Sequence, residues 1–421
     1  MPGCKAVAET SLTSLFGLMR LPHSVTFGSG QRHALGGVTS QIGRRALVCT
    51  DQRLATDETF RALLTGLTRA GVEVRVFDRT LPDLPVESLL ECVSQVGAFD
   101  PEVVIGIGGG SCLDLAKAAA LLLRFGGGIE GYYGELKVPG PTLPVIAVPT
   151  TAGTGSEVTP VAVIGDSARN MKIGVASPYL IPVAAICDPE LTVSCPAGLT
   201  ASSGGDALTH AIESFTAGAR DATPGLALEQ VFVGKNRLSD HFASLAITSI
   251  WRSLRRAYVN GSDLGAREDL MLGALAAGCA FGTAGTAAAH ALQYPVGNLT
   301  HSAHGSGVAA LLPYVMEYNR PMCVAAFAQI GRAVGLSDPT GSDDALSRTL
   351  VDEVANLLAS VGIPRTLREL GLPEDKQEWT AQSALAIARL IKNNPRPLDL
   401  QALRQITQAA YTGNRALLQH T

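Results

Sequence analysis

Several patterns that would assign the chain to a common class are missing. The 421-residue chain has eight cysteines, scattered from Cys4 to Cys323, but no Cys-x-x-Cys pair. Scattered thiols in a long chain indicate reduced, mostly buried cysteines in a cytoplasmic protein, and argue against a disulfide framework or a thiolate zinc site. Lysine and arginine are dispersed and the net charge is −4, so there is no electrostatic footprint for nucleic acid.

A membrane segment is not expected either. Residues 1–20 contain no continuous apolar core, which makes them a poor signal peptide. Residues 270–289 carry no charge and have the nominal length of a membrane span. This stretch is dominated by alanine, glycine and threonine, and His290 follows it at once. We therefore expect a tightly packed, buried helix pair and no contact with a membrane.

The first half of the chain alternates between short apolar runs and amphipathic segments. A hydrophobic fraction of 46% and a charged fraction of 17% are typical of a well-packed globular protein. Strands are expected at 45–50, 73–77, 103–107 and 143–148, with 171–173 and 184–188 completing the sheet domain, and helices at 59–70, 86–96 and 112–125. Strands alternating with helices at this spacing predict a doubly wound parallel sheet.

After Pro196 the pattern is helical. Helices are expected at 240–258, 267–279, 305–318, 321–334, 343–362 and 398–411. The prediction is therefore an α/β dinucleotide-binding domain at 1–195 and an all-helical metal-binding and catalytic domain at 196–421. The site is expected between them, because ligand pockets are common at domain interfaces.

A glycine-rich turn follows the strand predicted at 103–107. Gly108-Gly109-Gly110-Ser111 stands between this strand and the next helix. Glycines let the backbone approach a phosphate, and a helix N-terminus supplies free N–H groups. The turn is not GxGxxG, and many such turns bind nothing, so a phosphate site and a plain turn are both open. Residues 149–159, rich in hydroxyls and glycine, follow the next strand at the edge where α/β proteins bind ligands, although surface loops often have this composition.

The polar residues best suited to bind a metal ion lie in the second half of the chain. Asp206 and His210 are four residues apart in a helix-favouring run, which places both on one helical face. The segment from His290 to His304 adds His290, His301 and His304. One carboxylate with two or three imidazoles suits Fe(II) or Zn(II), with a position left open for substrate.

These motifs resemble the iron-containing (group III) alcohol dehydrogenase family. They are Gly108-Gly-Gly-Ser111-x-x-Asp114, the run Pro-Thr-Thr-Ala-Gly-Thr-Gly-Ser-Glu at 149–157, the run Gly-Asp-Ala-Leu-Thr-His-Ala-Ile-Glu at 205–213, and His290 with His304-Gly305 fourteen residues later. The likeness runs over nearly the whole chain. It implies an NAD-linked oxidoreductase with a dinucleotide-binding domain and a helical metal-binding domain, and an oligomer, a dimer. The implied metal ligands are Asp206, His210, His290 and His304.

The resemblance also implies the residues that hold the cofactor. Asp51 matches the acid that hydrogen-bonds the adenosine ribose, and a carboxylate there would repel a 2′-phosphate, so NAD(H) is favoured over NADP(H). Asp51 is equally suited to cap the following helix, and both roles can hold. The remaining implied contacts are the pyrophosphate turn of Gly108, Gly109, Gly110 and Ser111, its support Asp114, the nicotinamide-side Thr150, Thr151 and Thr154, and Lys172 near the ribose. The loop at 81–85 lacks an asparagine that the family commonly has there.

One departure concerns the proton relay. Many family members have a second histidine four residues after the third ligand, and this chain has Tyr294 there. A hydroxyl with a reference pKa of ~10 is a poorer proton shuttle near neutrality. Tyr294 and His301 are therefore alternative catalytic residues, and Tyr294 could also simply pack in the cleft. The His-x-x-x-Tyr-Pro arrangement also resembles the hydroxyacid-oxoacid transhydrogenase branch.

The function expected from the sequence is metal-dependent, NAD-linked interconversion of an alcohol and an aldehyde. Hydride would pass between the alcohol carbon and the nicotinamide ring, while Fe²⁺ or Zn²⁺ lowers the pKa of the alcohol. The small residues before His290 favour a narrow pocket for a short-chain substrate. The alternatives are the transhydrogenase and a non-catalytic homologue that binds nucleotide or metal.

Overall fold

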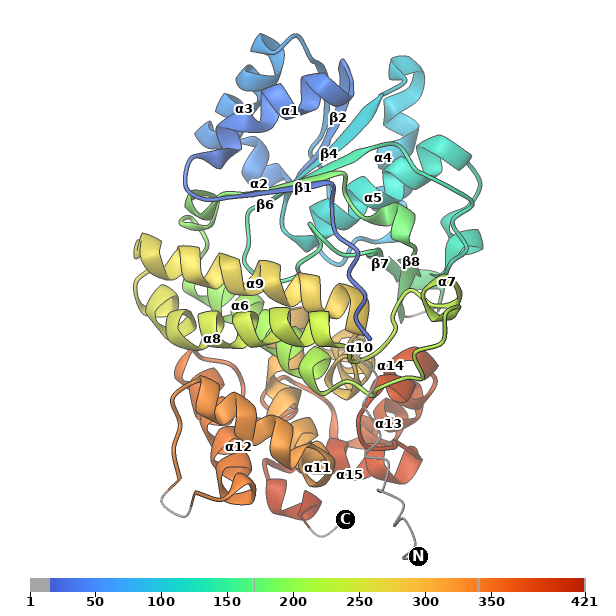
Figure 1. Ribbon diagram of the computed structural model, residues 1–421. Helices are drawn as coiled ribbons and strands as arrows, with labels where there is room; N and C mark the ends of the chain where they lie inside the picture. Colours follow the sequence, from blue (N-terminus) through green and yellow to red (C-terminus); the bar gives the residue numbers. More distant parts are fainter. Residues whose placement is uncertain (1–15, 170, 339–340, 420–421) are drawn as a thin grey trace, which may run out of the picture.

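The computed structural model is a stack of an α/β half on a helical half (Figure 1). The structure describes residues 16–169, 171–338 and 341–419. Of the stretch 1–20 that is expected not to be a signal peptide, residues 1–15 lie outside the described residues.

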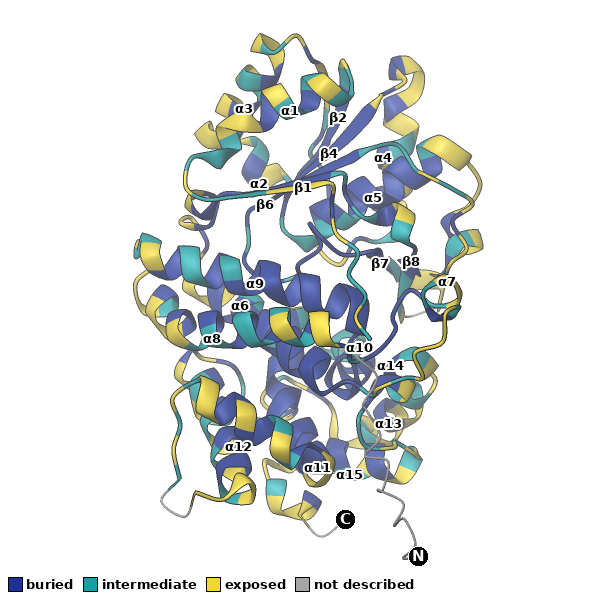
Figure 2. Ribbon diagram, in the orientation of Figure 1, coloured by how far each residue is buried: buried dark blue, intermediate teal, exposed yellow. Residues whose placement is uncertain are grey.

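The centre of the first half is a six-stranded sheet. Its order is β1-β9-β6-β4-β2-β3, and every neighbouring pair is parallel. The strands are β1 (Ser24–Phe27), β2 (Arg45–Cys49), β3 (Glu73–Phe77), β4 (Val103–Gly108), β6 (Val145–Pro149) and β9 (Ala184–Cys187). The central strands β4 and β6 are buried along their whole length, as expected of apolar runs covered on both faces (Figure 2).

Helices cover both faces of this sheet. They are α1 (Leu35–Ile42), α2 (Gln52–Ala55), α3 (Glu58–Arg69), α4 (Val86–Val96) and α5 (Gly110–Phe125). One apolar cluster joins Leu35 of α1 and Phe60 of α3 to the sheet, and a separate cluster joins Leu89 of α4 and Leu115 of α5 to it. Two cores on opposite faces confirm the doubly wound α/β architecture.

Residues 171–173 form a strand, as predicted, but this strand is not part of the six-stranded sheet. They belong to β8 (Met171–Ala176), in a separate three-stranded sheet with β5 (Gly134–Glu135) and β7 (Val161–Asp166). β7 and β8 pair antiparallel across a short turn, in which Arg169 N donates to Asp166 Oδ1. A parallel strand would need a crossover of about a dozen residues, which this connection is too short to provide.

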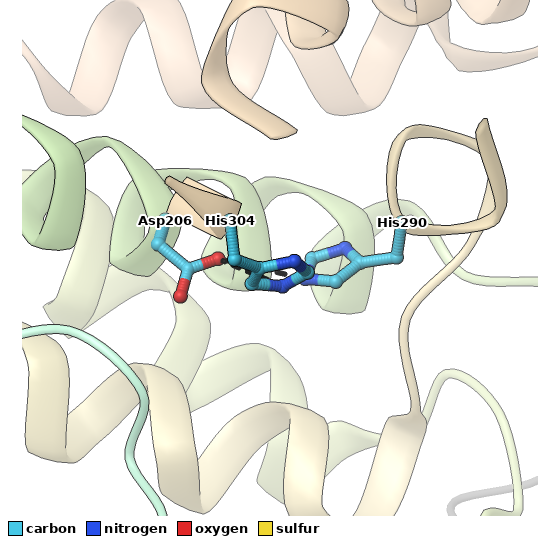
Figure 3. A group of neighbouring side chains, drawn as sticks. All are labelled: Asp206, His290 and His304. Carbon is cyan, nitrogen blue, oxygen red and sulfur yellow. Dashed lines mark ion pairs between the residues drawn. The ribbon is translucent and has the colours of Figure 1, made fainter. Parts of the chain in front are cut away.

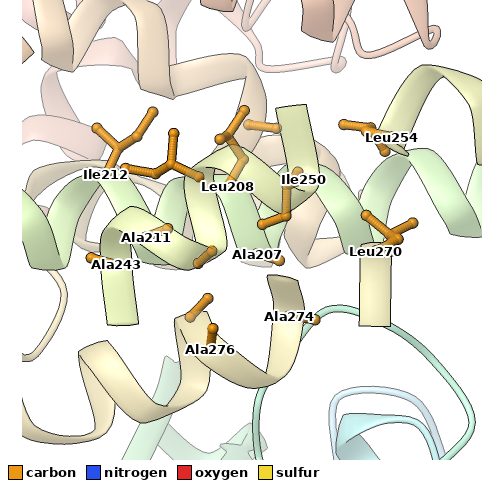
Figure 4. Close-up of a cluster of buried hydrophobic side chains, with 14 of the residues drawn as sticks. Ala207, Leu208, Ala211, Ile212, Ala243, Ile250, Leu254, Leu270, Ala274 and Ala276 are labelled. Atoms are coloured by element: carbon orange, nitrogen blue, oxygen red, sulfur yellow. The ribbon is translucent and has the colours of Figure 1, made fainter. Parts of the chain in front are cut away.

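The second half is helical, as predicted. Its helices are α6 (Ala197–Thr216), α7 (Leu226–Glu229), α8 (Arg237–Val259), α9 (Leu264–Ala284), α10 (Ala288–Thr300), α11 (His304–Ala333), α12 (Asp343–Ser360), α13 (Gln377–Leu385), α14 (Ala388–Asn393) and α15 (Leu400–Thr412). Leu208 of α6, Ile250 of α8 and Leu270 of α9 belong to its largest apolar cluster (Figure 4).

Two helices predicted at 305–318 and 321–334 are one continuous helix, α11. Pro321 lies inside it and removes one backbone donor. Packing at both ends holds the helix together: a Cβ on Gly305 would lie 2.2 Å from the Ser202 carbonyl oxygen of α6, and one on Gly331 would lie 3.0 Å from Leu346 Cγ of α12. Tertiary contacts here outweigh the local cost of the proline.

The uncharged stretch 270–289 forms most of α9 and the start of α10, and nearly all of its residues are buried. Within the described parts of the chain, no single helix has the length and apolarity needed to cross a membrane. The pair α9 and α10 meets that criterion only when taken together, and the two helices are bent by 103°.

The two halves touch directly at the loop after β6. Gly155 in this loop has φ +60, and a Cβ there would lie 2.4 Å from Cα of Gly278 in α9. A Cβ on Gly153 would lie 2.7 Å from Ser203 Cβ in α6. Because only glycine allows this approach, the loop at 149–159 rests on the helices that carry the polar residues described next.

Candidate active site

Helix α6 presents three buried polar residues on one face. Asp206, His210 and Glu213 follow each other at spacings of four and three residues, which bring them to the same side of a helix. Gly305 lets α11 lie against this helix, because a Cβ there would be 2.9 Å from Asp206 Cβ. The close packing brings His304, at the start of α11, beside Asp206.

Oxygen and nitrogen donors from three helices converge at this point (Figure 3). Asp206 Oδ1 lies 3.7 Å from His210 Nε2, 3.6 Å from His290 Nε2 and 3.9 Å from His304 Nε2. Asp206, His290 and His304 each offer one ligand atom, and these three atoms lie within 4.8 Å of one another. Two ligands about 2.1 Å from a tetrahedral ion are about 3.4 Å apart, so these spacings fit a first-row divalent metal.

The same atoms lack other partners. Asp206 Oδ1 and His290 Nε2 are buried and have no hydrogen bond within the described residues. A buried polar atom without a partner costs about 1–3 kcal/mol, and a cation bound between these atoms would remove that cost. The donor set therefore fits a metal by its chemistry as well as by its spacing.

His290 is oriented by a carboxylate that the sequence reasoning did not assign. Glu213 accepts hydrogen bonds from His290 Nδ1 at 2.6 Å, from Ala287 N at 2.8 Å and from Ala289 N at 2.7 Å. The bond to Nδ1 leaves Nε2 facing Asp206, the arrangement that histidine ligands use when a carboxylate holds their other nitrogen. The pattern that could have revealed Glu213 is its spacing of seven residues from Asp206.

The electrostatics of the group favour a cation. Burial raises the pKa of Asp206, but the imidazoles of His210, His290 and His304 outweigh burial and lower it, so the carboxylate is ionised. Burial lowers the pKa of His210 to about 4 and that of His304 to about 3, which leaves both rings neutral and able to ligate. Burial also lowers the pKa of His290, but Glu213 and Asp206 outweigh it and raise it to about 9.

The glycine turn between β4 and α5 faces the same cavity. Gly108 has φ +153, and a Cβ there would lie 2.5 Å from Cys112 Sγ, so only glycine fits. A Cβ on Gly110 would lie 2.6 Å from Thr154 Cγ2, so the turn closes against the loop at 149–159. Gly110 and Ser111, at the N-terminus of α5, line the cavity that also contains Asp206.

Asp114 connects this turn to the neighbouring loop and strand by hydrogen bonds. Its carboxylate accepts a hydrogen bond from Ser156 Oγ at 2.5 Å and one from Val163 N at 2.9 Å, joining α5 to the loop and to β7. Burial raises the pKa of Asp114. Lys172 on β8 pairs with Asp83 at 2.7 Å, and both line the cavity. Asp83, which was not assigned a role from the sequence, stands in the loop where the family asparagine is lacking.

The predicted cofactor residues do not all reach this cavity. Those that line it are Gly110, Ser111, Asp114, Thr154 and Lys172. Thr150 is buried and its hydroxyl has no partner in the described chain, while Gly109 lies beside Thr151, with 3.5 Å from a Cβ there to Thr151 Cγ2. Asp51 follows β2 by two residues and caps α2 by accepting a hydrogen bond from Leu54 N at 2.8 Å, so its capping role is present and its ribose contact stays a prediction.

The two candidate proton-relay residues are placed very differently. Tyr294 lines the cavity, with its ring centre 6.1 Å from that of His304, and burial raises the pKa of its hydroxyl. His301 ends α10 with φ +51, is exposed, and is not part of the cavity wall. The geometry therefore favours Tyr294 and does not bring His301 to the metal ligands.

Comparisons with known proteins show the family to which the chain belongs. Residues 22–189 match the family model described as iron-containing alcohol dehydrogenase, and residues 200–411 match the C-terminal model of the Fe-containing alcohol dehydrogenase family. The chain is 40% identical to long-chain-alcohol dehydrogenase 1 of Geobacillus thermodenitrificans (strain NG80-2), over 88% of this chain and 90% of that protein. It is 34% identical to the NAD-dependent methanol dehydrogenase of Bacillus methanolicus, over 93% and 98% of the two chains.

A solved structure gives the same result for the fold. The crystal structure of a 1,3-propanediol oxidoreductase superposes with a TM-score of 0.87 at 31% identity, covering 94% of this chain and all of that one. Two family models together match most of the sequence, and the relatives align over nearly their full lengths. The chain therefore belongs to the iron-containing alcohol dehydrogenase family.

Proposed function

We propose that this chain is a metal-dependent, NAD(H)-linked alcohol dehydrogenase that interconverts a small alcohol and its aldehyde. The observation that carries the proposal is that one cavity is lined both by metal-ligating atoms and by a helix N-terminus. Asp206 and His290, which have unpartnered ligand atoms, line it together with Gly110 and Ser111 at the N-terminus of α5. A substrate between them would meet a cation and a nicotinamide at once.

The metal would be held by Asp206, His210, His290 and His304. Fe²⁺ and Zn²⁺ both suit a carboxylate with imidazoles, and the bound ion would act as a Lewis acid toward the substrate oxygen. Glu213 keeps His290 Nε2 aimed at the site by holding Nδ1. His210 is fixed by stacking on Phe281, with ring centres 4.1 Å apart.

The cofactor would bind across the glycine turn. Free N–H groups at the start of α5 suit a pyrophosphate, and Gly110 and Ser111 at this helix N-terminus line the cavity. The Asp51 carboxylate, which follows β2, would favour NAD(H) over NADP(H). Tyr294 would be the proton-relay residue, because its side chain lines the cavity and that of His301 does not.

We further infer a homodimer in the cytoplasm. The dimer rests on the family resemblance. The cytoplasmic location is supported by the seven described cysteines, from Cys49 to Cys323, all of which are buried and unpaired.

The proposal is tested by NADH oxidation with chelator-stripped protein, with and without added Fe²⁺ or Zn²⁺, against short aldehydes and 2-keto acids. Aldehyde reduction that depends on one added metal is expected. If the protein instead exchanges hydride between a hydroxy acid and a keto acid without free NAD, the transhydrogenase replaces the dehydrogenase. Binding of metal or NADH without turnover of any aldehyde or keto acid would leave only the non-catalytic homologue and refute the proposal.

A further inference from the structure

Arg389 lines the cavity, and neither the metal site nor the cofactor site proposed above assigns it a role. Arg389 lies on the short helix α14 and lines the same cavity as Tyr294 and His304. Its guanidinium is half-buried and stacks on the ring of Phe232, with Cζ 4.5 Å from the ring centre. Stacking on a buried aromatic ring fixes the plane of the guanidinium and weakens its hydration.

The guanidinium of Arg389 has no anion of its own. Within the described chain it forms no ion pair and no side-chain hydrogen bond. Burial lowers the pKa of Arg220 and the positive charge of Arg389 lowers it further, so a second cation lies near Arg389. Glu135, the acid nearby, acts on Arg220 and uses one carboxylate oxygen to accept a hydrogen bond from Val231 N.

The acidic residues that line the cavity already have other partners. Asp83 pairs with Lys172, and Asp114 accepts from Ser156 and Val163. Asp206 lies near the imidazoles, with its Oδ1 3.6 Å from His290 Nε2. Arg389 nevertheless lines the same cavity as Tyr294 and His304, so its positive charge faces the space in which a substrate would bind.

We propose that Arg389 makes this cavity select alcohols and aldehydes that carry an anionic group, a carboxylate or a sulfonate, at the end remote from the reacting carbon. This inference rests on the proposed function and names its substrate class. A planar guanidinium binds both oxyanions through paired N–H donors, and its stacking on Phe232 means that little ordering is needed on binding. A neutral substrate would leave this cation without a counter-charge.

The test compares aldehydes of one chain length on the metal-loaded enzyme with NADH. The readout is the ratio of kcat/KM for 4-oxobutanoate to that for butanal, with 3-oxopropanesulfonate against propanal as the sulfonate arm. The wild-type ratio is expected to exceed one, and R389L should lower it roughly 10- to 100-fold, the range for a hydrogen bond to a charged group. R389K, which keeps a charge without the planar fork, should fall between.

A matched control removes another stacked guanidinium. Arg368 lies over the ring of Tyr411, with Cζ 4.8 Å from its centre, and it does not line the cavity. R368L should leave the ratio at the wild-type value. A wild-type ratio at or below one, or an unchanged ratio in R389L, would overturn the proposal. A rise in the KM for NADH in R389L with no change in the ratio would assign Arg389 to the cofactor and overturn it as well.

Failure of the proposed function is recognised separately. If butanal and 4-oxobutanoate are both left unreduced, the dehydrogenase proposal fails. Calorimetric titration of the wild type and R389L with 4-hydroxybutanoate and 1-butanol then decides the anion preference by binding alone. Preferential binding of the anion that R389L abolishes supports the role of Arg389, and equal binding refutes it.

Discussion

Replacing Glu213 by glutamine should weaken metal binding as well as the fold. The carboxylate accepts three hydrogen bonds, and an amide can keep at most the two that reach one oxygen, those from Ala287 N and His290 Nδ1. Its NH₂ group then faces the N–H of Ala289, which loses its acceptor. One buried donor without a partner costs about 1–3 kcal/mol of stability. If the amide turns the other way, His290 loses the acceptor that directs Nε2 toward Asp206.

Metal affinity should fall by a free energy of similar size. Partners of ligand histidines are typically worth a factor of ~10–100 in metal affinity, or about 1.4–2.7 kcal/mol. The assay is competition for Zn²⁺ or Fe²⁺ between metal-free protein and a chromophoric chelator, with denaturant unfolding run in parallel. The expected Kd for metal in E213Q is ~10–100 times that of the wild type.

Glu317 supplies the matched control. It is also a buried glutamate in a helix, but it lies near Arg320 and Arg415, at 3.6 and 3.9 Å, and not near the imidazoles. E317Q should lower the unfolding free energy and leave the metal Kd within about a factor of two of the wild type. The reasoning is refuted if E213Q holds the metal as tightly as the wild type, or if both variants weaken it equally.

Three further predictions concern packing, pH and cofactor choice. Gly305→Ala should lower the melting temperature and the metal content, because its Cβ would lie 2.2 Å from a backbone oxygen of α6, whereas Gly198→Ala, which points into open space, should be neutral or stabilise by up to ~1 kcal/mol; similar melting temperatures for the two would contradict this packing. Burial raises the pKa of Glu157 from 4.5 to about 7, so the folded state keeps a proton that the unfolded state releases between these values. The unfolding free energy of the wild type relative to E157Q should therefore fall as the pH rises from 4.5 to 7, by about 1–3 kcal/mol, and a constant difference in urea unfolding would exclude the shift. Asp51→Asn keeps a capping oxygen for α2 but removes the charge, so kcat/KM for NADPH relative to NADH should rise about tenfold with stability within ~0.5 kcal/mol. No change in that ratio would mean that Asp51 is only a cap.

The parts of the fold that follow from local sequence were predictable. The helix at 86–96 and the strand at 73–77 occur at the expected residues, because hydrophobic periodicity and the preceding Pro85 define them locally. Pro321 led to the wrong prediction of a helix break, because packing of α11 against α6 and α12 keeps the helix continuous. The hairpin of β7 and β8 was missed since its pairing depends on partners and not on composition.

The same distinction applies to the site. Helical spacing alone brings Asp206 and His210 together, and the family resemblance supplied His290 and His304. Glu213 went unassigned because its partner His290 is 77 positions away and only the folded chain brings them together. The ion pair of Asp83 and Lys172 joins residues 89 positions apart and was hidden for the same reason.

The contact of Gly155 with Gly278 limits how the enzyme can open. The backbones of the two halves meet here without an intervening side chain, since a Cβ on Gly155 would lie only 2.4 Å from Gly278 Cα. A rotamer change therefore cannot relax this contact, and it restricts sliding of one half over the other. Because Thr154 and Ser156, on either side of Gly155, line the cavity, this restriction acts directly beside the site.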